Sequence, residues 1–282
     1  MEMDYALVGV ASVVVVIIIA ILFYKKRNEN ADINITKDSG ENKSPDELKL
    51  LKAEEYFIAG RLDEAHDLLV PLTDKGMGRA LFLMAGYYEN GYGSNINIDK
   101  HVSDEFYEKA AKAGEVLAMF HILKDNYNSP RLQKYIKEME ELAAKGDVIV
   151  KNELVKAYFV ANDCVNNNKI IACYKELLKT KYWLAKRDLA LCYIFGRGMK
   201  KDLNKAQEYI RLLQGIDDPL ISYLLADLSL IPPATILNKY KYAADKGLFC
   251  ANMAYGASLY FGKIYHGLKF DVTTALSNDV DD

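Results

Sequence analysis

The hydrophobic and polar positions of residues 80–114 predict two consecutive helices joined by a turn. Over residues 80–88, apolar side chains lie on nearly every side of the helix, which is typical of a helix packed between neighbours. Gly91 and Gly93 end this helix, because glycine tolerates positive φ, and polar turn residues surround them. A second helix then carries a narrow apolar stripe and stops at Gly114. The stretch therefore predicts one helical hairpin.

Imperfect copies of this hairpin recur along the chain. The best second copy covers residues 185–213, and a third begins at Ala251. Between Gly76 and Gly247, helix-ending glycines fit five periods of roughly 34 residues, which is the length of a two-helix repeat. Because each unit of this kind buries its apolar face against the next one, the expected product is a solenoid.

The second copy repeats the pattern of the first at similar offsets. Its residues Ala185, Leu189, Tyr193, Gly196 and Gly198 stand where the first copy has Ala80, Met84, Tyr88, Gly91 and Gly93. This pattern, A-x3-L/M-x3-Y-x2-G-x-G followed by D, A, Y/F and AAxxG, resembles the Sel-1-like repeat, a relative of the tetratricopeptide repeat. The resemblance implies an all-α fold, namely a right-handed α/α superhelical solenoid that acts as an adaptor or scaffold, with no catalytic residue and no cofactor.

The resemblance spans residues 46–276, but it is uneven. Residues 116–146 and 217–247 lack the GxG turn, and residues 148–182 lack both that turn and the final glycine. We therefore expect the superhelix to be irregular in these segments.

Residues 5–24 form an uncharged run rich in valine and isoleucine. At a rise of about 1.5 Å per residue, such a helix covers the roughly 30 Å of a hydrocarbon core, so the run predicts a single transmembrane helix. A cleaved signal peptide is the alternative, but the leading MEMD has no Lys or Arg, the run is too long and no A-x-A site follows. Basic residues 25–27 follow the span, which by the positive-inside rule places residues 1–4 outside and the solenoid in the cytoplasm, at a membrane expected to be a bacterial inner membrane.

The chain thus divides into an N-terminal stub, an anchor, a tether, a solenoid and an acidic tail. These parts cover residues 1–4, 5–24, 25–44, 45–276 and 277–282. The tether is polar and cannot bury enough apolar surface to fold alone, so we expect it to be flexible. Ser44 and Glu47 have the spacing of a capping box and Pro45 suits the first helical turn, so the solenoid begins with a defined helix start.

Composition and the candidate chemical groups exclude several classes of function. Lys and Arg number 36 against 39 Asp and Glu, which is no basic excess of the kind found in nucleic-acid-binding proteins. The four cysteines and four histidines lack the spacing of a metal site. Cys164 and Cys173 could meet across one turn, but in the cytoplasm free thiols are expected. The GxG pairs do not continue as phosphate-binding motifs, so we expect no enzyme, no metal and no cofactor.

The twenty tyrosines are the more informative group. Tyr88, Tyr193 and Tyr260 fall on repeat positions and are expected to pack between hairpins. Others stand beside those positions, and in related solenoids the first helices of the hairpins line a concave surface, where Tyr and Arg dominate binding energies. This analogy selects four partner-binding candidates: Tyr87, His121, Arg187 and Tyr255.

The expected function is a membrane-anchored scaffold or adaptor for protein–protein interaction, which recruits a protein partner to the cytoplasmic face of the membrane. Tethering raises the local concentration of a ligand without new contacts. The alternative is an inhibitor or immunity-type protein that blocks one toxin or enzyme. Because such proteins usually face the periplasm, the basic residues 25–27 argue against it.

Overall fold

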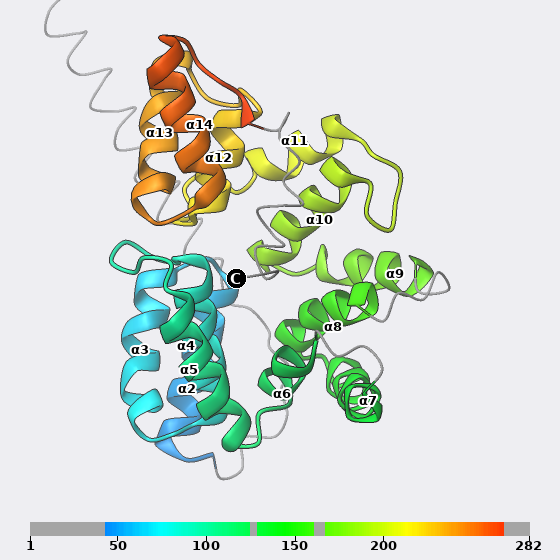
Figure 1. Cartoon of the computed structure of the whole chain (residues 1–282). Helices are drawn as coiled ribbons and strands as arrows, with labels where there is room; N and C mark the ends of the chain where they lie inside the picture. Colours follow the sequence, from blue (N-terminus) through cyan, green and yellow to red (C-terminus); the bar gives the residue numbers. More distant parts are fainter. Residues whose placement is uncertain (1–42, 125–128, 161–166, 268–282) are drawn as a thin grey trace, which may run out of the picture. The chain divides into compact units, whose positions relative to one another are not determined.

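The computed structural model describes residues 43–267, apart from residues 125–128 and 161–166 (Figure 1). The predicted anchor at 5–24, nearly all of the tether and the acidic tail lie outside these residues. Among the helices that are described, none combines the length and the apolar character that a membrane span needs.

The described part of the chain consists of helices and their connections, without a strand, so the prediction of an all-α fold is confirmed. Its helices form six hairpins and one last single helix. The hairpins are α2 (Pro45–Ile58) with α3 (Leu62–Asp74), α4 (Gly78–Asn90) with α5 (Lys100–Lys112), α6 (Val116–Leu123) with α7 (Pro130–Ala144), α8 (Val148–Val160) with α9 (Asn167–Leu177), α10 (Trp183–Phe195) with α11 (Leu203–Arg211), and α12 (Pro219–Asp227) with α13 (Pro233–Asp245), followed by α14 (Phe249–Phe261).

The predicted helix start at Ser44 is confirmed. The Glu47 backbone N–H donates to Ser44 Oγ at 3.3 Å, and the Ser44 backbone N–H donates to Glu47 Oε2 at 2.6 Å. The two side chains thus satisfy two of the backbone donors that the first turn of α2 leaves without an intrahelical partner.

Left-handed glycines end α4, α10 and α14. Gly91, Gly196 and Gly262 have φ values of 68°, 71° and 63° at the C-caps of these helices. Any residue with a Cβ atom is strained at such φ values, so these turns need glycine, as the sequence predicts. The three glycines also align the helices residue by residue, which allows equivalent positions of the repeats to be compared.

The residue three positions before this glycine packs within its own hairpin. Tyr88 stacks on Phe106 with ring centroids 5.7 Å apart, and Tyr193 stacks on Tyr209 at 6.1 Å. In α14 the equivalent residue is Leu259. Tyr260 is 85 % exposed, so the expectation that it packs between hairpins is wrong. It lies one position, or about 100° of helix rotation, away from the packing site.

Each helix packs chiefly against its neighbours in the chain, as in a solenoid. Contacts between distant repeats are added to this pattern. Trp183 Nε1 of α10 donates to the Phe57 carbonyl of α2 at 2.8 Å. Lys246, which follows α13, reaches the turn between α4 and α5, where the Ile98 N–H donates to the Lys246 carbonyl at 2.8 Å. The first two hairpins therefore contact the last ones (Figure 1).

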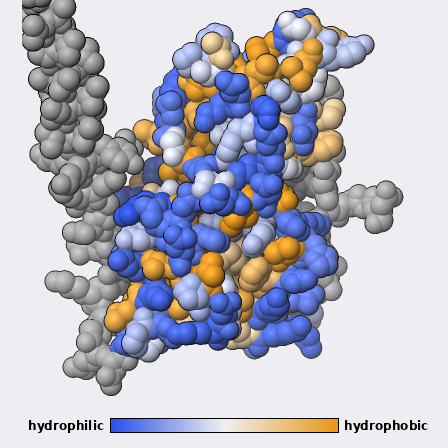
Figure 2. All heavy atoms as spheres, turned by 90° about the vertical axis from the view of Figure 1, so that its left-hand side faces the viewer, coloured by the Kyte–Doolittle hydropathy of each residue, from blue (hydrophilic) through white to orange (hydrophobic). Residues whose placement is uncertain are grey.

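The surface is mainly hydrophilic on the face that Figure 2 shows, and hydrophobic side chains are also visible at its upper end. The last described helix, α14, carries a group of exposed large apolar residues: Phe249, Met253, Leu259, Tyr260 and Phe261. Leu259 is thus exposed at a position where α4 and α10 carry rings that stack on the second helix of their hairpin.

Candidate binding pocket on the first helices of the hairpins

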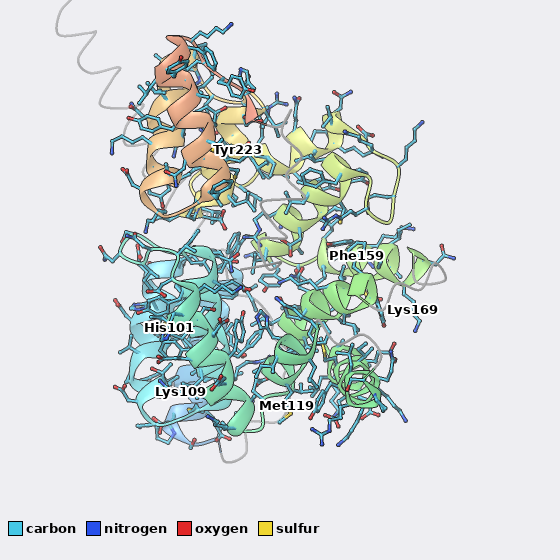
Figure 3. All side chains as sticks on the ribbon, in the orientation of Figure 1. His101, Lys109, Met119, Phe159, Lys169 and Tyr223 are labelled. Carbon is cyan, nitrogen blue, oxygen red and sulfur yellow. The ribbon has the colours of Figure 1, made fainter. Side chains whose placement is uncertain are left out.

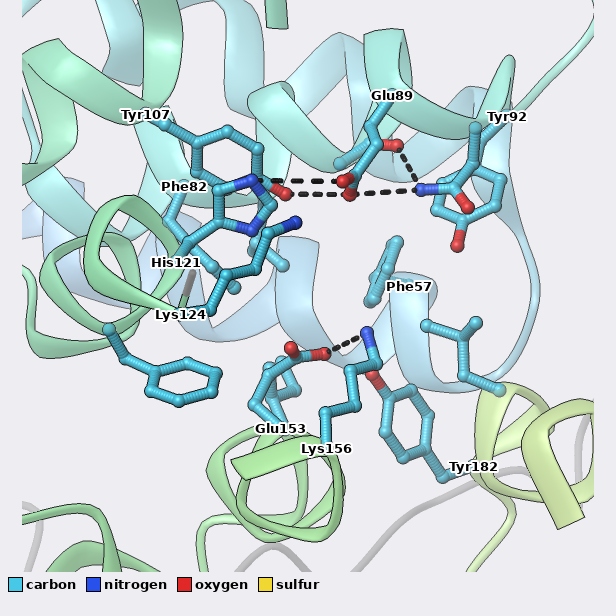
Figure 4. A pocket seen from close by; sticks show the side chains of 16 residues that line it. Phe57, Phe82, Glu89, Tyr92, Tyr107, His121, Lys124, Glu153, Lys156 and Tyr182 are labelled. Atoms are coloured by element: carbon cyan, nitrogen blue, oxygen red, sulfur yellow. Dashed lines mark hydrogen bonds and ion pairs between the residues drawn. The ribbon is translucent and has the colours of Figure 1, made fainter. Parts of the chain in front are cut away.

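A cavity of about 120 Å³ lies among the first helices of five successive hairpins (Figure 4). Its walls come from α2, α4, α6 and its C-cap, α8 and the start of α10, with one residue from α5 and one from the α4–α5 turn. The lining residues are Phe57, Phe82, Leu83, Gly86, Glu89, Asn90, Tyr92, Tyr107, Phe120, His121, Lys124, Ile149, Glu153, Lys156, Tyr182 and Leu184. Aromatic rings and ionisable groups thus meet in one concave site.

Glu89, in the last turn of α4, is at the centre of the polar contacts. Its Oε2 atom accepts a hydrogen bond from the Tyr107 hydroxyl at 2.8 Å. Its Oε1 atom lies 3.7 Å from His121 Nε2, which is too far for a good hydrogen bond. The His121 ring stacks on the Tyr107 ring, with centroids 3.5 Å apart and an interplanar angle of 15°. The three side chains therefore hold one another in place.

The charge states of this group follow from its surroundings. Desolvation lowers the pKa of His121. The attraction of Glu89 opposes this effect, but the nearby Lys124, Lys156 and Lys100 add to it, so the pKa is about 4 and the imidazole is neutral at pH 7. Desolvation alone raises the pKa of Glu89. His121 when protonated, Lys156, Lys124 and the Tyr107 hydroxyl together outweigh it, and the pKa lies below its ordinary value. Glu89 is therefore an ionised carboxylate beside a neutral ring.

An ion pair faces Glu89 across the pocket. Lys156 Nζ and Glu153 Oε1, one turn apart on α8, lie 2.7 Å from each other. In Figure 4 Glu89 and this pair are on opposite sides of the cavity. The charges of Glu153 and Lys156 largely cancel, whereas Glu89 has no cation in hydrogen-bonding contact among the described residues.

The polar groups at the rim are accessible although protein surrounds them. The Glu89 side chain is 40 % exposed and that of Lys156 is 47 % exposed, whereas Tyr107 is buried below them. A charged group in a concave wall, still open to solvent, is the arrangement of a binding site rather than of a core.

Of the four partner-binding candidates selected from the sequence, one lines the pocket. His121 is part of its wall, and Tyr255 lies half-buried on α14, outside the lining. Tyr87 does not project from α4: it is fully buried, and its hydroxyl donates to the Leu62 carbonyl at 2.7 Å. A partner cannot touch it without unpacking the hairpin.

Arg187 is also held inside the protein. It is 5 % exposed, and its Nη1 donates to Asp218 Oδ2 at 2.8 Å and to the Tyr92 hydroxyl at 3.2 Å. Asp188 accepts from its Nε and Nη2 atoms at 3.1 and 3.0 Å. The side chain thus joins α10 to the α4–α5 turn and to the start of α12, which is a structural role.

The sequence reasoning missed Glu89, Tyr107, Glu153 and Lys156. One feature pointed to Glu89: it is an acidic residue in the last turn of a helix, where the helix dipole disfavours negative charge. The equivalent residues, two positions before the helix-ending glycine, are Ile194 in α10 and Tyr260 in α14. The carboxylate is therefore not a requirement of the repeat.

Within the described ranges, no group of three His, Cys, Asp or Glu side chains is arranged to hold a metal ion. Cys173, Cys192 and Cys250 are free thiols, and Cys164 lies outside the described residues.

The fold defines a class, that of all-α proteins built from stacked helical hairpins. No protein-family model matches the chain, and no curated protein does. Among solved structures, it is similar to a Sel1 repeat protein from Oxalobacter formigenes, with 21 % identity over 82 % of this chain and 97 % of that chain and a TM-score of 0.42. It is also similar to c5321, a protective antigen present in uropathogenic Escherichia coli strains displaying an SLR fold, with 17 % identity over 84 % and 54 % of the two chains and a TM-score of 0.37. At these scores, the assignment to the class rests on the hairpins of the chain itself.

Proposed function

We propose that this protein is a Sel-1-like scaffold for protein–protein interaction, and that the pocket around Glu89 receives a segment of the partner protein. The observation that carries the proposal is the lining itself, since first helices of five successive hairpins contribute to one concave, partly charged site. Solenoids bind their ligands on concave surfaces of this kind. The rigid aromatic side chains of the wall provide contact area at a small loss of side-chain entropy.

The second part of the proposal concerns the location of the scaffold. The uncharged run at residues 5–24 supports anchoring in a membrane, and the basic residues 25–27 favour a cytoplasmic scaffold. On this view, the anchor keeps the pocket near the bilayer and so concentrates partners there.

Photo-crosslinking with the full chain in its source cells tests binding. A photoreactive amino acid replaces Lys124 at the pocket in one variant and Glu105, an exposed residue of α5, in a matched control. We expect one or a few defined protein adducts at position 124 that the control does not give. If position 124, and then positions 153 and 156, give no adduct beyond the control, the pocket is not a protein-binding site.

Deletion of residues 5–24 tests anchoring separately. We expect the chain and its crosslinked partner to move together from the membrane fraction to the soluble fraction. If the crosslinked partner has a toxic or hydrolytic activity and the chain blocks it, the inhibitor function takes the place of the scaffold function.

A further inference from the structure

Glu89 has no acidic counterpart in the two other helices that end at a left-handed C-cap glycine, α10 and α14. At the equivalent place α10 has Ile194 and α14 has Tyr260, so stacking of the hairpins does not require a carboxylate there. The position is also unfavourable for one. The last turn of α4 is the negative end of its helix dipole, although the Tyr87 and Tyr88 carbonyls accept hydrogen bonds from backbone N–H groups of the following turn. A carboxylate that the stacking does not require, and that is partly exposed in a pocket, suits a ligand of opposite charge.

The C-terminal end of a second helix also lies at the pocket. Helix α6 ends at Leu123, and its C-cap residue Lys124 lines the cavity. Lys124 offsets the carbonyl groups of its own helix end. Glu89 therefore lies where the C-terminal ends of α4 and α6 meet, and Lys124 is the cation that balances the second of them.

The contacts of Glu89 leave one of its oxygens available. Oε2 accepts from Tyr107, whereas Oε1 has no hydrogen bond from any described residue. His121, at 3.7 Å, is neutral at pH 7, and the charge of Lys156 is taken up by Glu153 at 2.7 Å. A donor brought by a ligand can therefore complete the hydrogen bonds of Glu89.

The rest of the wall suits a flat cation with an apolar stem. The stacked rings of Tyr107 and His121 lie beside the carboxylate, and Phe57, Tyr92 and Tyr182 line the cavity as well. Aromatic faces attract cations and stack on guanidinium groups. A volume of about 120 Å³ is that of one side chain, since pockets for whole small molecules have roughly 300 Å³ or more.

We propose that the pocket binds an arginine side chain of the partner protein, with the guanidinium donating to Glu89 Oε1 and stacked against the aromatic wall. This proposal rests on the proposed function, because it names the group of the partner that the pocket selects. Arginine is favoured over lysine since its planar, forked donors match a carboxylate and stack on rings. Lys124 and Lys156 limit the affinity of the site for any cation.

Ligand-observed nuclear magnetic resonance with the full chain in detergent tests the assignment. The probes are N-acetyl-arginine amide, its neutral isostere N-acetyl-citrulline amide, and N-acetyl-aspartate amide. We expect the arginine probe to bind about tenfold more tightly than the citrulline probe, which is the effect of one charge-assisted contact. Glu89→Gln should reduce the affinity for arginine about tenfold, whereas Lys156→Gln should increase it.

The matched control is Glu105→Gln, which removes a carboxylate from the exposed face of α5, between His101 and Lys109 (Figure 3). We expect it to leave the affinity for arginine unchanged. Glu89→Gln can still accept from Tyr107 through its amide oxygen, and an unchanged circular-dichroism melt will show that it folds.

Two results would overturn the proposal: equal arginine binding by Glu89→Gln and the natural chain, or preferred binding of the aspartate probe that Lys156→Gln abolishes. Adducts at position 124 without a preference for arginine would reject the arginine site and leave the scaffold function in place. If arginine is not preferred and positions 124, 153 and 156 also give no adduct beyond the control, both the arginine site and the scaffold function are rejected.

Discussion

The ammonium group of Lys246 lies 2.6 Å from the carbonyl oxygen of Gly93, although 153 positions separate the two residues. The same group donates to the carbonyls of Ser94 and Ile96 at 2.9 and 2.8 Å. Lys246 is only 5 % exposed, and desolvation lowers its pKa. One buried cation thus holds the α4–α5 turn of the second hairpin against the end of α13.

We predict that Lys246→Met is strongly destabilising, because it leaves three carbonyl groups without their shared donor. The expected loss is about 2–4 kcal/mol in the free energy of unfolding, measured by urea denaturation. Lys241→Met is the control. Lys241 is exposed and pairs with Asp245 one turn away, so its replacement should change stability by less than about 0.5 kcal/mol. Equal losses in the two variants would show that the Lys246 contact contributes little.

Gly247 allows a second test of the same junction, and Gly256 of α14 serves as the comparison. Gly247 has a φ of 97°, and a Cβ added to it would lie 3.3 Å from Ile98 Cβ. Gly247→Ala should therefore destabilise the protein by about 1–2 kcal/mol or more. Gly256 lies within α14, with no atom within 4 Å of an added Cβ. Gly256→Ala should instead stabilise by about 0.5–1 kcal/mol, because alanine favours a helix. Thermal melts of both variants measure whether each substitution raises or lowers the stability.

The carboxylate of Glu54 is expected to make stability fall with rising pH. It lies 2.9 Å from Arg79 Nε, but Asp147 and Glu115 bind the same guanidinium. Desolvation, with repulsion from these two acids, outweighs the attraction of Arg79 and raises the pKa of Glu54 to about 7. Between pH 4.5 and 7 the unfolded chain releases this proton and the folded chain keeps it, so stability decreases as the pH rises.

Glu54→Gln removes that dependence. Its stability relative to the natural chain should increase from pH 4.5 to pH 7 by at most about 3 kcal/mol. Urea denaturation across this range measures the difference. A constant difference would mean that Glu54 ionises normally in the folded protein.

His121 should act in the opposite direction. Its folded pKa of about 4 is below its ordinary value, so between pH 6.5 and 4 the unfolded chain takes up a proton that the folded chain refuses. This stability is complete above pH 6.5 and is lost as the pH falls towards 4. His121→Gln, whatever its constant loss from the missing ring stack, should gain on the natural chain by at most about 3 kcal/mol over this interval. A titration of the His121 ring by nuclear magnetic resonance that gives a pKa near 6.5 would contradict the prediction.

Local patterns gave the hairpins reliably, because their causes are local. The capping box at Ser44 and the left-handed turn at Gly91 depend on residues within four positions of each other. The direction in which a single side chain points was harder to predict, because neighbouring positions such as Tyr87 and Tyr88 differ by about 100° of helix rotation. Tyr87 is in the core, whereas Tyr88 stacks on Phe106 at the surface of the hairpin.

The pocket and the Lys246 contact could not be predicted from the sequence in this way. Glu89 and Lys156 come from hairpins that are separated by a third one, and their meeting depends on how the stack curves. Nothing in the residues around Lys246 distinguishes it from the many exposed lysines of the chain. Its burial follows from the distant turn at Gly93.

The contact between Lys246 and Gly93 also bears on how the protein unfolds. An open repeat array frays from its ends, because each unit depends only on its two neighbours. Here an early hairpin and a late one stabilise each other directly, so neither can melt without weakening the other. The array is thereby expected to behave as one cooperative unit, and to fold more slowly than its helical content suggests, because its closing contact is among the most distant in sequence.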